Sequence, residues 1–205
     1  MATSTTNPSP KSRKVKALLA GGLVLGVGAA VTLAAWTDQE WTEGLFGSGS
    51  FNIQGSTDGT TWAEHESSAG SANLVFDLPA SSNLSPSDVV AAPFALQLDA
   101  GTTYDATVAL ASATVDGLNA ANLTYGIVQV ANFADCNPTA TGTTIVPAGT
   151  TLGTTTGASD FALTAGTDGA AGSTVNLCFQ VTAGEDLVQG DETTAQWQFI
   201  GTSVE

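Results

Sequence analysis

The chain has 205 residues, of which 11% are charged, and its 19 acidic residues outnumber four Lys and Arg to give a formal charge of −15. All four cations lie between Lys11 and Lys16, and every Asp and Glu lies at or beyond Asp38. This separation excludes nucleic-acid binding by the part of the chain beyond Lys16, because that part has no cation to replace phosphate counterions.

The N-terminal region has the three-part order of an export signal. A basic cluster precedes an uncharged run at residues 17–35, and an aromatic and acidic junction begins at Trp36. The cations stay in the cytoplasm, the apolar run enters the bilayer, and the small residues near its end allow cleavage. We therefore expect residues 1–35 to be a signal peptide, cut near Ala34 or Ala35, and to be the only membrane contact. The run has 19 residues, which is enough to span a bilayer, so a retained anchor is the alternative.

Short runs of alternating apolar and polar residues follow the signal, and such runs are typical of half-buried strands. They lie at residues 45–54, 94–98, 104–111, 123–130, 175–181 and 194–200. Turns such as Asp58-Gly59 and Leu84–Asp88 separate them. No segment after the signal shows a sustained helical repeat. The pattern predicts an all-β domain over residues 51–205, an antiparallel β-sandwich, and leaves jelly-roll and immunoglobulin-like topologies open.

Two of the predicted regions have special features. In the run at residues 123–130 the apolar parity changes beside Gly126, which predicts a β-bulge. Residues 134–172 are rich in Thr, Gly and Ala, and we expect one or two short edge strands and the most mobile loops there.

The chain has two cysteines, Cys136 and Cys178. Because they follow an export signal, we expect them to meet an oxidising compartment and to form a disulfide. Closing that loop stabilises the fold by at most about 4 kcal/mol in the chain-entropy model. Two buried free thiols are the alternative.

No set of residues in the sequence has the pattern of a catalytic site. The only histidine, His65, lies between Glu64 and Glu66, whose side chains point to the other face of an extended chain. There is no His-Glu-x-x-His pair for zinc and no Gly-x-Ser-x-Gly elbow for a nucleophile. We therefore predict no catalytic residues and no enzyme, with a metal-bound His65 or a Ser-His-Asp triad as alternatives.

Loop carboxylates are the candidate calcium ligands, because extracellular calcium suits all-oxygen sites of low affinity. The candidates are Asp58, Asp168, Asp186, Asp191 and Glu192. None fits an EF-hand pattern, and turn-forming Asp-Gly pairs and solvated acids are the alternative explanation. We predict no other cofactor.

The end of the signal has a Gly- and Ala-rich core, a small residue, an aromatic residue and an acidic motif, at residues 26–30 (GVGAA) and 34–40 (AAWTDQE). Residues 45–53 (LFGSGSFNI) then form an aromatic, Ser- and Gly-rich lead-in, and residues 84–88 (LSPSD) form a turn before the next run. In these features the chain resembles the TasA/camelysin family, whose turn carries Gly where Ser87 stands here.

This resemblance implies a jelly-roll fold, export with the SipW-type signal peptidase as a partner, and a secreted or cell-surface role, often as a biofilm-matrix fibre subunit. The cysteine pair and the lack of cations after the signal differ from TasA itself and suggest an actinobacterial-type relative. Camelysin relatives have been classed as metallopeptidases, but this sequence contains no ligand set for that activity.

Cleavage would free an apolar segment at residues 36–50 that could add as a strand to the open edge of a neighbouring sandwich and so build a filament. The assembly candidates are Trp36, Trp41, Leu45, Phe46, Phe51 and Ile53. In the alternative, Phe51 and Ile53 belong to their own domain, while Trp36 and Trp41 fray. Assembly would require salt or divalent ions to screen the acidic charge.

Three functions follow as hypotheses from these features. The first is a secreted structural protein that self-associates into filaments. The second is a monomeric surface module whose loops at residues 134–172 bind a glycan or a host protein. The third, a hydrolase, would depend on His65 as its general base.

Overall fold

The computed structural model describes residues 11, 14–16, 18–19, 50–76 and 83–204. The chain divides into two compact units, Met1–Phe46 and Gly47–Glu205. In the first unit the described residues are helical and exposed. No helix among the described residues is both long and apolar enough to cross a membrane. The cleavage residues Ala34, Ala35 and Trp36 lie outside the described residues, as does the apolar run except Leu18 and Leu19.

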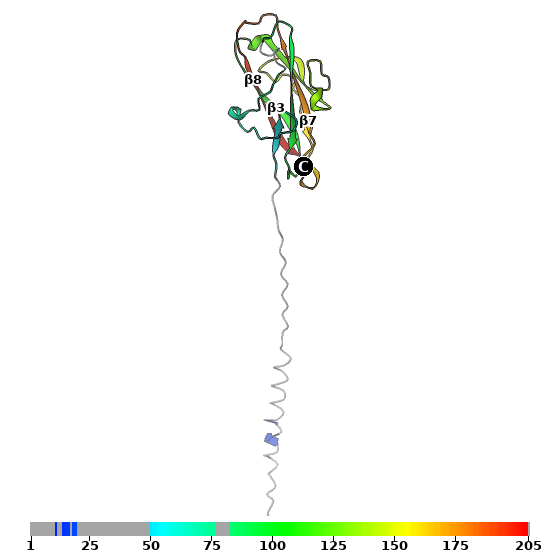
Figure 1. Ribbon diagram of the computed structural model, residues 1–205. Coiled ribbons are helices and arrows are strands. Elements are labelled where there is room, and N and C mark those ends of the chain that lie inside the picture. The colour runs from blue at the N-terminus through cyan, green and yellow to red at the C-terminus, as the bar shows by residue number, and fades with distance from the viewer. Residues whose placement is uncertain (1–10, 12–13, 17, 20–49, 77–82, 205) are drawn as a thin grey trace, which may run out of the picture. The chain divides into compact units, whose positions relative to one another are not determined.

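The second unit is an antiparallel β-sandwich with eight strands among its described residues (Figure 1). The strands are β1 (Ile53–Ser56), β2 (Val89–Leu98), β3 (Asp105–Asp116), β4 (Leu123–Val130), β5 (Thr143–Thr151), β6 (Phe161–Leu163), β7 (Val175–Ala183) and β8 (Thr194–Val204). Short 3-10 turns lie at η1 (Ser68–Gly70), η3 (Ala120–Asn122), η4 (Phe133–Asp135) and η5 (Thr167–Gly169). One sheet has the order β1-β2-β7-β4-β5 and the other the order β6-β3-β8.

The connectivity is that of a jelly roll with an extra strand beside each sheet. Three antiparallel pairs are nested in the sequence, β2 with β7, β3 with β6, and β4 with β5. These pairs alternate between the two sheets, while β1 extends the larger sheet and β8 extends the smaller one. Such nesting is the pattern of a jelly roll rather than of an immunoglobulin sandwich. The predicted fold class is therefore confirmed.

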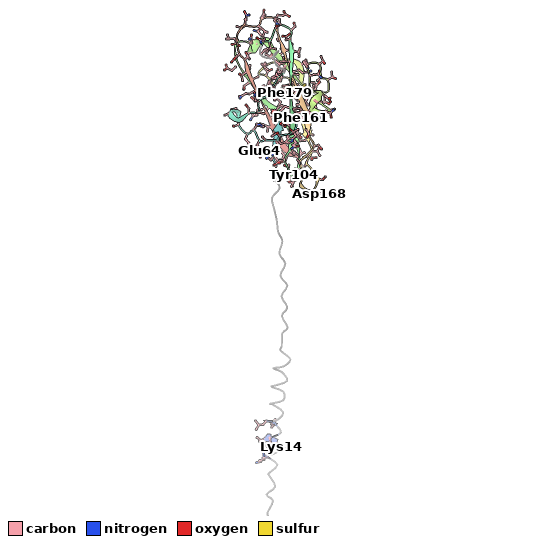
Figure 2. The ribbon with its side chains drawn as sticks, in the orientation of Figure 1. Lys14, Glu64, Tyr104, Phe161, Asp168 and Phe179 are labelled. Carbon is pink, nitrogen blue, oxygen red and sulfur yellow. A yellow bond between two sulfur atoms is a disulfide. The ribbon has the colours of Figure 1, made fainter. Side chains whose placement is uncertain are left out.

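The core lies between the sheets and centres on aromatic side chains. The ring of Phe179 on β7 is 4.9 Å from that of Trp197 and 6.3 Å from that of Phe199, both on β8. The ring of Phe199 is also 6.1 Å from that of Phe161, and Figure 2 shows Phe161 and Phe179 within the sandwich. Trp197 reaches Tyr125 on β4, at 5.6 Å between rings. β8 therefore packs across the inner face of the larger sheet.

The strand boundaries differ from the sequence-based expectations in places that have physical reasons. β1 begins at Ile53, later than the run at residues 45–54 predicted. β2 begins at Val89 and passes through Pro93, because β1 pairs only with Ala95–Leu98 and leaves the Pro93 side of β2 without a neighbour. β3 and β8 continue past the predicted ends, to Asp116 and Val204.

Other expectations are confirmed. β4 occupies residues 123–130 as predicted, and its register with β5 shifts on both sides of Ile127, next to Gly126. The stretch at residues 134–172 contains two edge strands, although β5, with nine residues, is not short. The turn at Leu84–Asp88 forms with Ser87 at a φ of 72°, the left-handed region that glycine favours.

Candidate functional site

The site we identify is the free edge of β8. One side of β8 pairs with β3 along eleven residues, from Thr194 to Val204. On its other side, no backbone hydrogen bond joins residues 194–204 to any other described segment. A row of unpaired backbone N–H and C=O groups is a template for pairing with another strand. β8 therefore presents an edge whose backbone groups pair with no described strand, and the segment at residues 65–76 is hydrogen-bonded to it only through the Gln196 side chain.

The other sheet edges in the described domain are less suited to pairing. β1 has four residues and β6 has three. β5 has nine residues, but it contains Pro147, which cannot donate a backbone hydrogen bond to a neighbour. β8 has neither a proline nor a charged residue, which are the usual means of protecting an edge.

The inward side chains of β8 are only partly covered. Ala195, Trp197 and Phe199 are half-buried, although they belong to the core-facing side of the strand. On β7, by contrast, Leu177 is 0% exposed and Phe179 is 1% exposed. The outward Ile200 is 48% exposed. The open edge thus leaves apolar surface in contact with water.

A hollow of about 1150 Å³ lies beside this strand. Its floor includes the apolar inner-face residues Val90, Phe94 and Val181 of the larger sheet, and residues 193–199 form one wall. The segment at residues 65–76 lines the hollow as well, and the Gln196 side chain donates hydrogen bonds to Ser68 O and Ser71 Oγ of that segment, at 3.0 and 3.4 Å.

The Trp197 indole, which lines the hollow, packs against the phenol ring of Tyr125 on β4. The Tyr125 hydroxyl donates a 2.6 Å hydrogen bond to the Thr154 carbonyl. Burial raises the pKa of the Tyr125 hydroxyl, and the neighbouring Trp197 indole offsets this only in part. The Trp197 Nε1 is buried without a hydrogen bond of ordinary geometry among the described residues, and the Tyr125 hydroxyl is the acceptor near it.

The opposite face of the larger sheet is closed by residues 131–142, which we call the disulfide strap. Cys136 in the strap forms the predicted disulfide with Cys178, with a Cα–Cα distance of 5.0 Å. Gln180 Nε2 donates hydrogen bonds to Asn137 O and Ala140 O in the strap, at 3.1 and 3.0 Å. Beneath the strap a second apolar cluster is buried around Ala91 and Cys178. The outward orientation of Cys178 was predicted by the alternation in β7.

The calcium candidates are not brought together. No group of three or more His, Cys, Asp or Glu within the described ranges is close enough to hold a metal ion. Asp58 Oδ1 instead accepts hydrogen bonds from the Thr60 and Thr61 N–H groups, at 2.8 and 2.6 Å, and these bonds lower its pKa far below the ordinary value. Asp191 Oδ2 accepts from the Leu118 and Asn119 N–H groups, at 2.8 and 3.1 Å. Asp58 therefore holds its own turn, whereas Asp191 joins the β7–β8 connection to the β3–β4 connection.

The remaining candidates are dispersed. Asp168 lies in η5 with a φ of 55° and is labelled with Tyr104 at one end of the domain in Figure 2. Asp186 contributes its backbone carbonyl to a hydrogen bond from Asn122 Nδ2, at 2.6 Å. Glu192 is exposed, as is His65, which lies at the lining of the hollow.

The expected assembly segment is divided by the structure. Ile53 is part of β1 and pairs with Leu98, so it belongs to its own domain. Phe51 is 39% exposed, and both Phe51 and Ile53 pack where a side chain on Gly201 of β8 would be. Trp36, Trp41, Leu45 and Phe46 lie outside the described residues.

Acidic residues are almost absent from the strands. Asp105 and Asp116, at the two ends of β3, are the only ones within the eight described strands, and all other described carboxylates lie in the connections. No protein-family model matches the chain, and no curated protein matches it in sequence. The function is therefore argued from this site.

Proposed function

We propose that the protein is a secreted structural component of an extracellular matrix or cell surface, and that its copies assemble into filaments by strand addition. The observation that carries this proposal is the free edge of β8, eleven residues long and without charge or proline, beside an apolar hollow. A strand added there would pair with the free backbone N–H and C=O groups of β8 and would cover the half-buried Trp197 and Phe199.

Three further observations support export and a structural role. The basic and apolar start of the chain has the order of an export signal, and the Cys136–Cys178 disulfide fits an oxidising compartment. The resemblance to the TasA/camelysin family adds the SipW-type signal peptidase as the export partner and fibres as the assembled form. The donor strand is the segment that cleavage would free, residues 36–50.

The alternative role as a binding module receives less support from the fold. Its loops were expected at residues 134–172, where β5 and β6 form and the disulfide strap is tied to β7. For the hydrolase alternative, the described residues form no metal-holding group of His, Cys, Asp and Glu around His65.

The proposal is tested by electron microscopy of residues 36–205 across salt concentrations, with and without calcium. We expect filaments from the unmodified protein and none from Gln198→Lys, which places a charge on the β8 edge. Thr143→Lys, which adds the same charge to exposed β5, is the matched control and should still form filaments. A second variant, Trp41→Ser with Phe46→Ser, removes the donor side chains. A monodisperse monomer under every condition would reject the filament proposal.

A further inference from the structure

We infer that the β8 edge of a free subunit is closed by β8 of a second copy, in an antiparallel pairing about a two-fold axis at Ile200. The consequence for assembly rests on the proposed function, because this dimer would occupy the edge that a donor strand needs. The pairing itself requires only the open edge.

Charge is the first reason to assign a second copy to this edge. Two copies carry the same sign everywhere beyond Lys16, so they can approach only where carboxylates are absent. β8 has no charged residue, and the neighbouring β3 has acidic residues only at its ends, Asp105 and Asp116. The middle of β8 is thus a long open edge on which like charges do not meet directly.

The order of side chains along β8 is the second reason. With Ile200 opposite its own copy, Phe199 lies opposite Gly201, and Gln198 lies opposite Thr202. Directly opposed residues in an antiparallel pair share one face, so the exposed Ile200 side chains cover each other. Phe199, whose ring packs in its own core, then lies opposite a glycine, so the pairing brings no second large side chain to the core-facing side at that position.

Pairings with the two-fold axis at a neighbouring residue bring less compatible side chains together. An axis at Phe199 sets the two Phe199 rings opposite each other on the core-facing side, which the larger sheet already fills. An axis at Gln198 sets Phe199 opposite Trp197 on that side and Ile200 opposite Gln196. Only the axis at Ile200 pairs the exposed apolar residue with itself and each large inward ring with a small residue. The register therefore follows from volume and polarity.

This contact differs in kind from the filament contact. An isologous two-fold pairing uses the same patch on both copies and closes, whereas head-to-tail strand addition continues. The dimer would therefore hold subunits in a form that cannot accept a donor strand. Because carboxylate repulsion opposes both contacts and salt screens it, the dimer should strengthen as salt is added.

Single-cysteine variants of residues 36–205 test the register. In Ile200→Cys the two thiols face each other across the axis, within reach of a disulfide. In Gln196→Cys the two thiols are eight residues out of register, about 27 Å apart. Under mild oxidation we expect at least about ten-fold more covalent dimer from Ile200→Cys than from Gln196→Cys. The double variant Gln196→Cys with Val204→Cys should restore cross-linking.

Equal cross-linking of the two single variants, or none in either, would overturn the inference. The unmodified protein provides a second measurement, because light scattering should show a dimer whose fraction rises with protein and salt concentration; a monomer throughout would also overturn it. The same experiments distinguish failure of the dimer from failure of the proposed function. Register-specific dimers without filaments would reject the filament proposal and support the dimer. Filaments without such dimers would reject the dimer and support the filament proposal.

Discussion

β7 and β8 have similar alternating sequences, VNLCFQV and TAQWQFI, but opposite surroundings. β7 has a strand on each side, the smaller sheet over its inner face and the disulfide strap over its outer face. Among the described strands β8 has one neighbour, and it borders a hollow and has an exposed outer face. Alternation is therefore enough to form a strand in both places, while the covering segments decide which strand is buried and which is available to a partner.

The largest expected contrast comes from truncating one apolar side chain on each strand. Phe179→Ala removes a ring that is 1% exposed and contacts both Trp197 and Phe199, so we expect it to lower the free energy of unfolding by about 3–5 kcal/mol. At protein concentrations low enough to keep the subunits apart, Ile200→Ala should change it by no more than about 0.5 kcal/mol, because Ile200 is exposed in the single subunit. Urea denaturation measures both values. Similar losses would mean that β8 is already covered in solution.

The disulfide should be the next largest contribution, and it acts only on the covered sheet. It closes a loop with a sequence separation of 42 residues, and the double variant Cys136→Ser with Cys178→Ser should lose about 2–4 kcal/mol. The released strap would also expose the cluster around Ala91 and Val130. Urea denaturation gives the loss, and hydrogen exchange locates it. Protection should fall in β2, β4 and β7 and remain unchanged in β8.

Much of the sandwich could be predicted from the sequence, because alternation is a local property. The bounds of β4, the parity of Cys178 on β7 and the Asp58-Gly59 turn all followed from neighbouring residues. The start of β1 and the passage of β2 through Pro93 did not, since both depend on where β1 pairs with β2. The pattern of residues along one strand does not show which part of it a second strand will pair with.

The candidate site was predicted only in part for the same reason. The run at residues 194–200 indicated a strand with Trp197 inward, yet nothing in it reveals that one edge lacks a neighbour. The one indication in the sequence was that β8 contains neither a charged residue nor a proline, which protect many edge strands from pairing. The loop carboxylates, in contrast, were identifiable as turn residues or solvated acids. Asp58 acts as a turn residue, while Asp191 accepts hydrogen bonds from another connection, which the sequence did not reveal.

Acid should loosen the covered side of the molecule before it affects β8. The turn at Asp58 packs against the strap, because Gly59 lies directly against the Phe133 ring. Hydrogen bonds from backbone N–H groups hold the pKa of Asp58 far below its ordinary value of 3.8, so its contribution to stability is present above that value and is lost as pH falls through the folded-state pKa.

Asp58→Asn keeps an acceptor oxygen but does not titrate. Its urea midpoint should therefore fall less between pH 5 and pH 2 than the midpoint of the unmodified protein. The other carboxylates are the same in both proteins, so their contribution to the pH dependence should be about equal. Asp160→Asn, in an exposed connection, provides the matched control. Identical pH profiles for Asp58→Asn and the unmodified protein would show that the turn contributes no acid-sensitive stability.

The smallest effect is expected at high pH. It concerns Tyr125, which packs against Trp197 between the two sheets. Burial raises the pKa of the Tyr125 hydroxyl above its ordinary value of 10.0, so the folded state holds this proton more tightly than the unfolded state does. The resulting stability is complete below pH 10 and declines as pH rises toward the folded-state pKa. In a Tyr104→Phe background Tyr125 is the only tyrosine, and its ionisation can be followed by ultraviolet absorbance. Adding Trp197→Phe removes the indole that favours the phenolate, and should raise the pKa further. An unchanged or lower pKa would mean that the Trp197 ring contributes more to the burial of Tyr125 than its N–H group contributes to stabilising the phenolate.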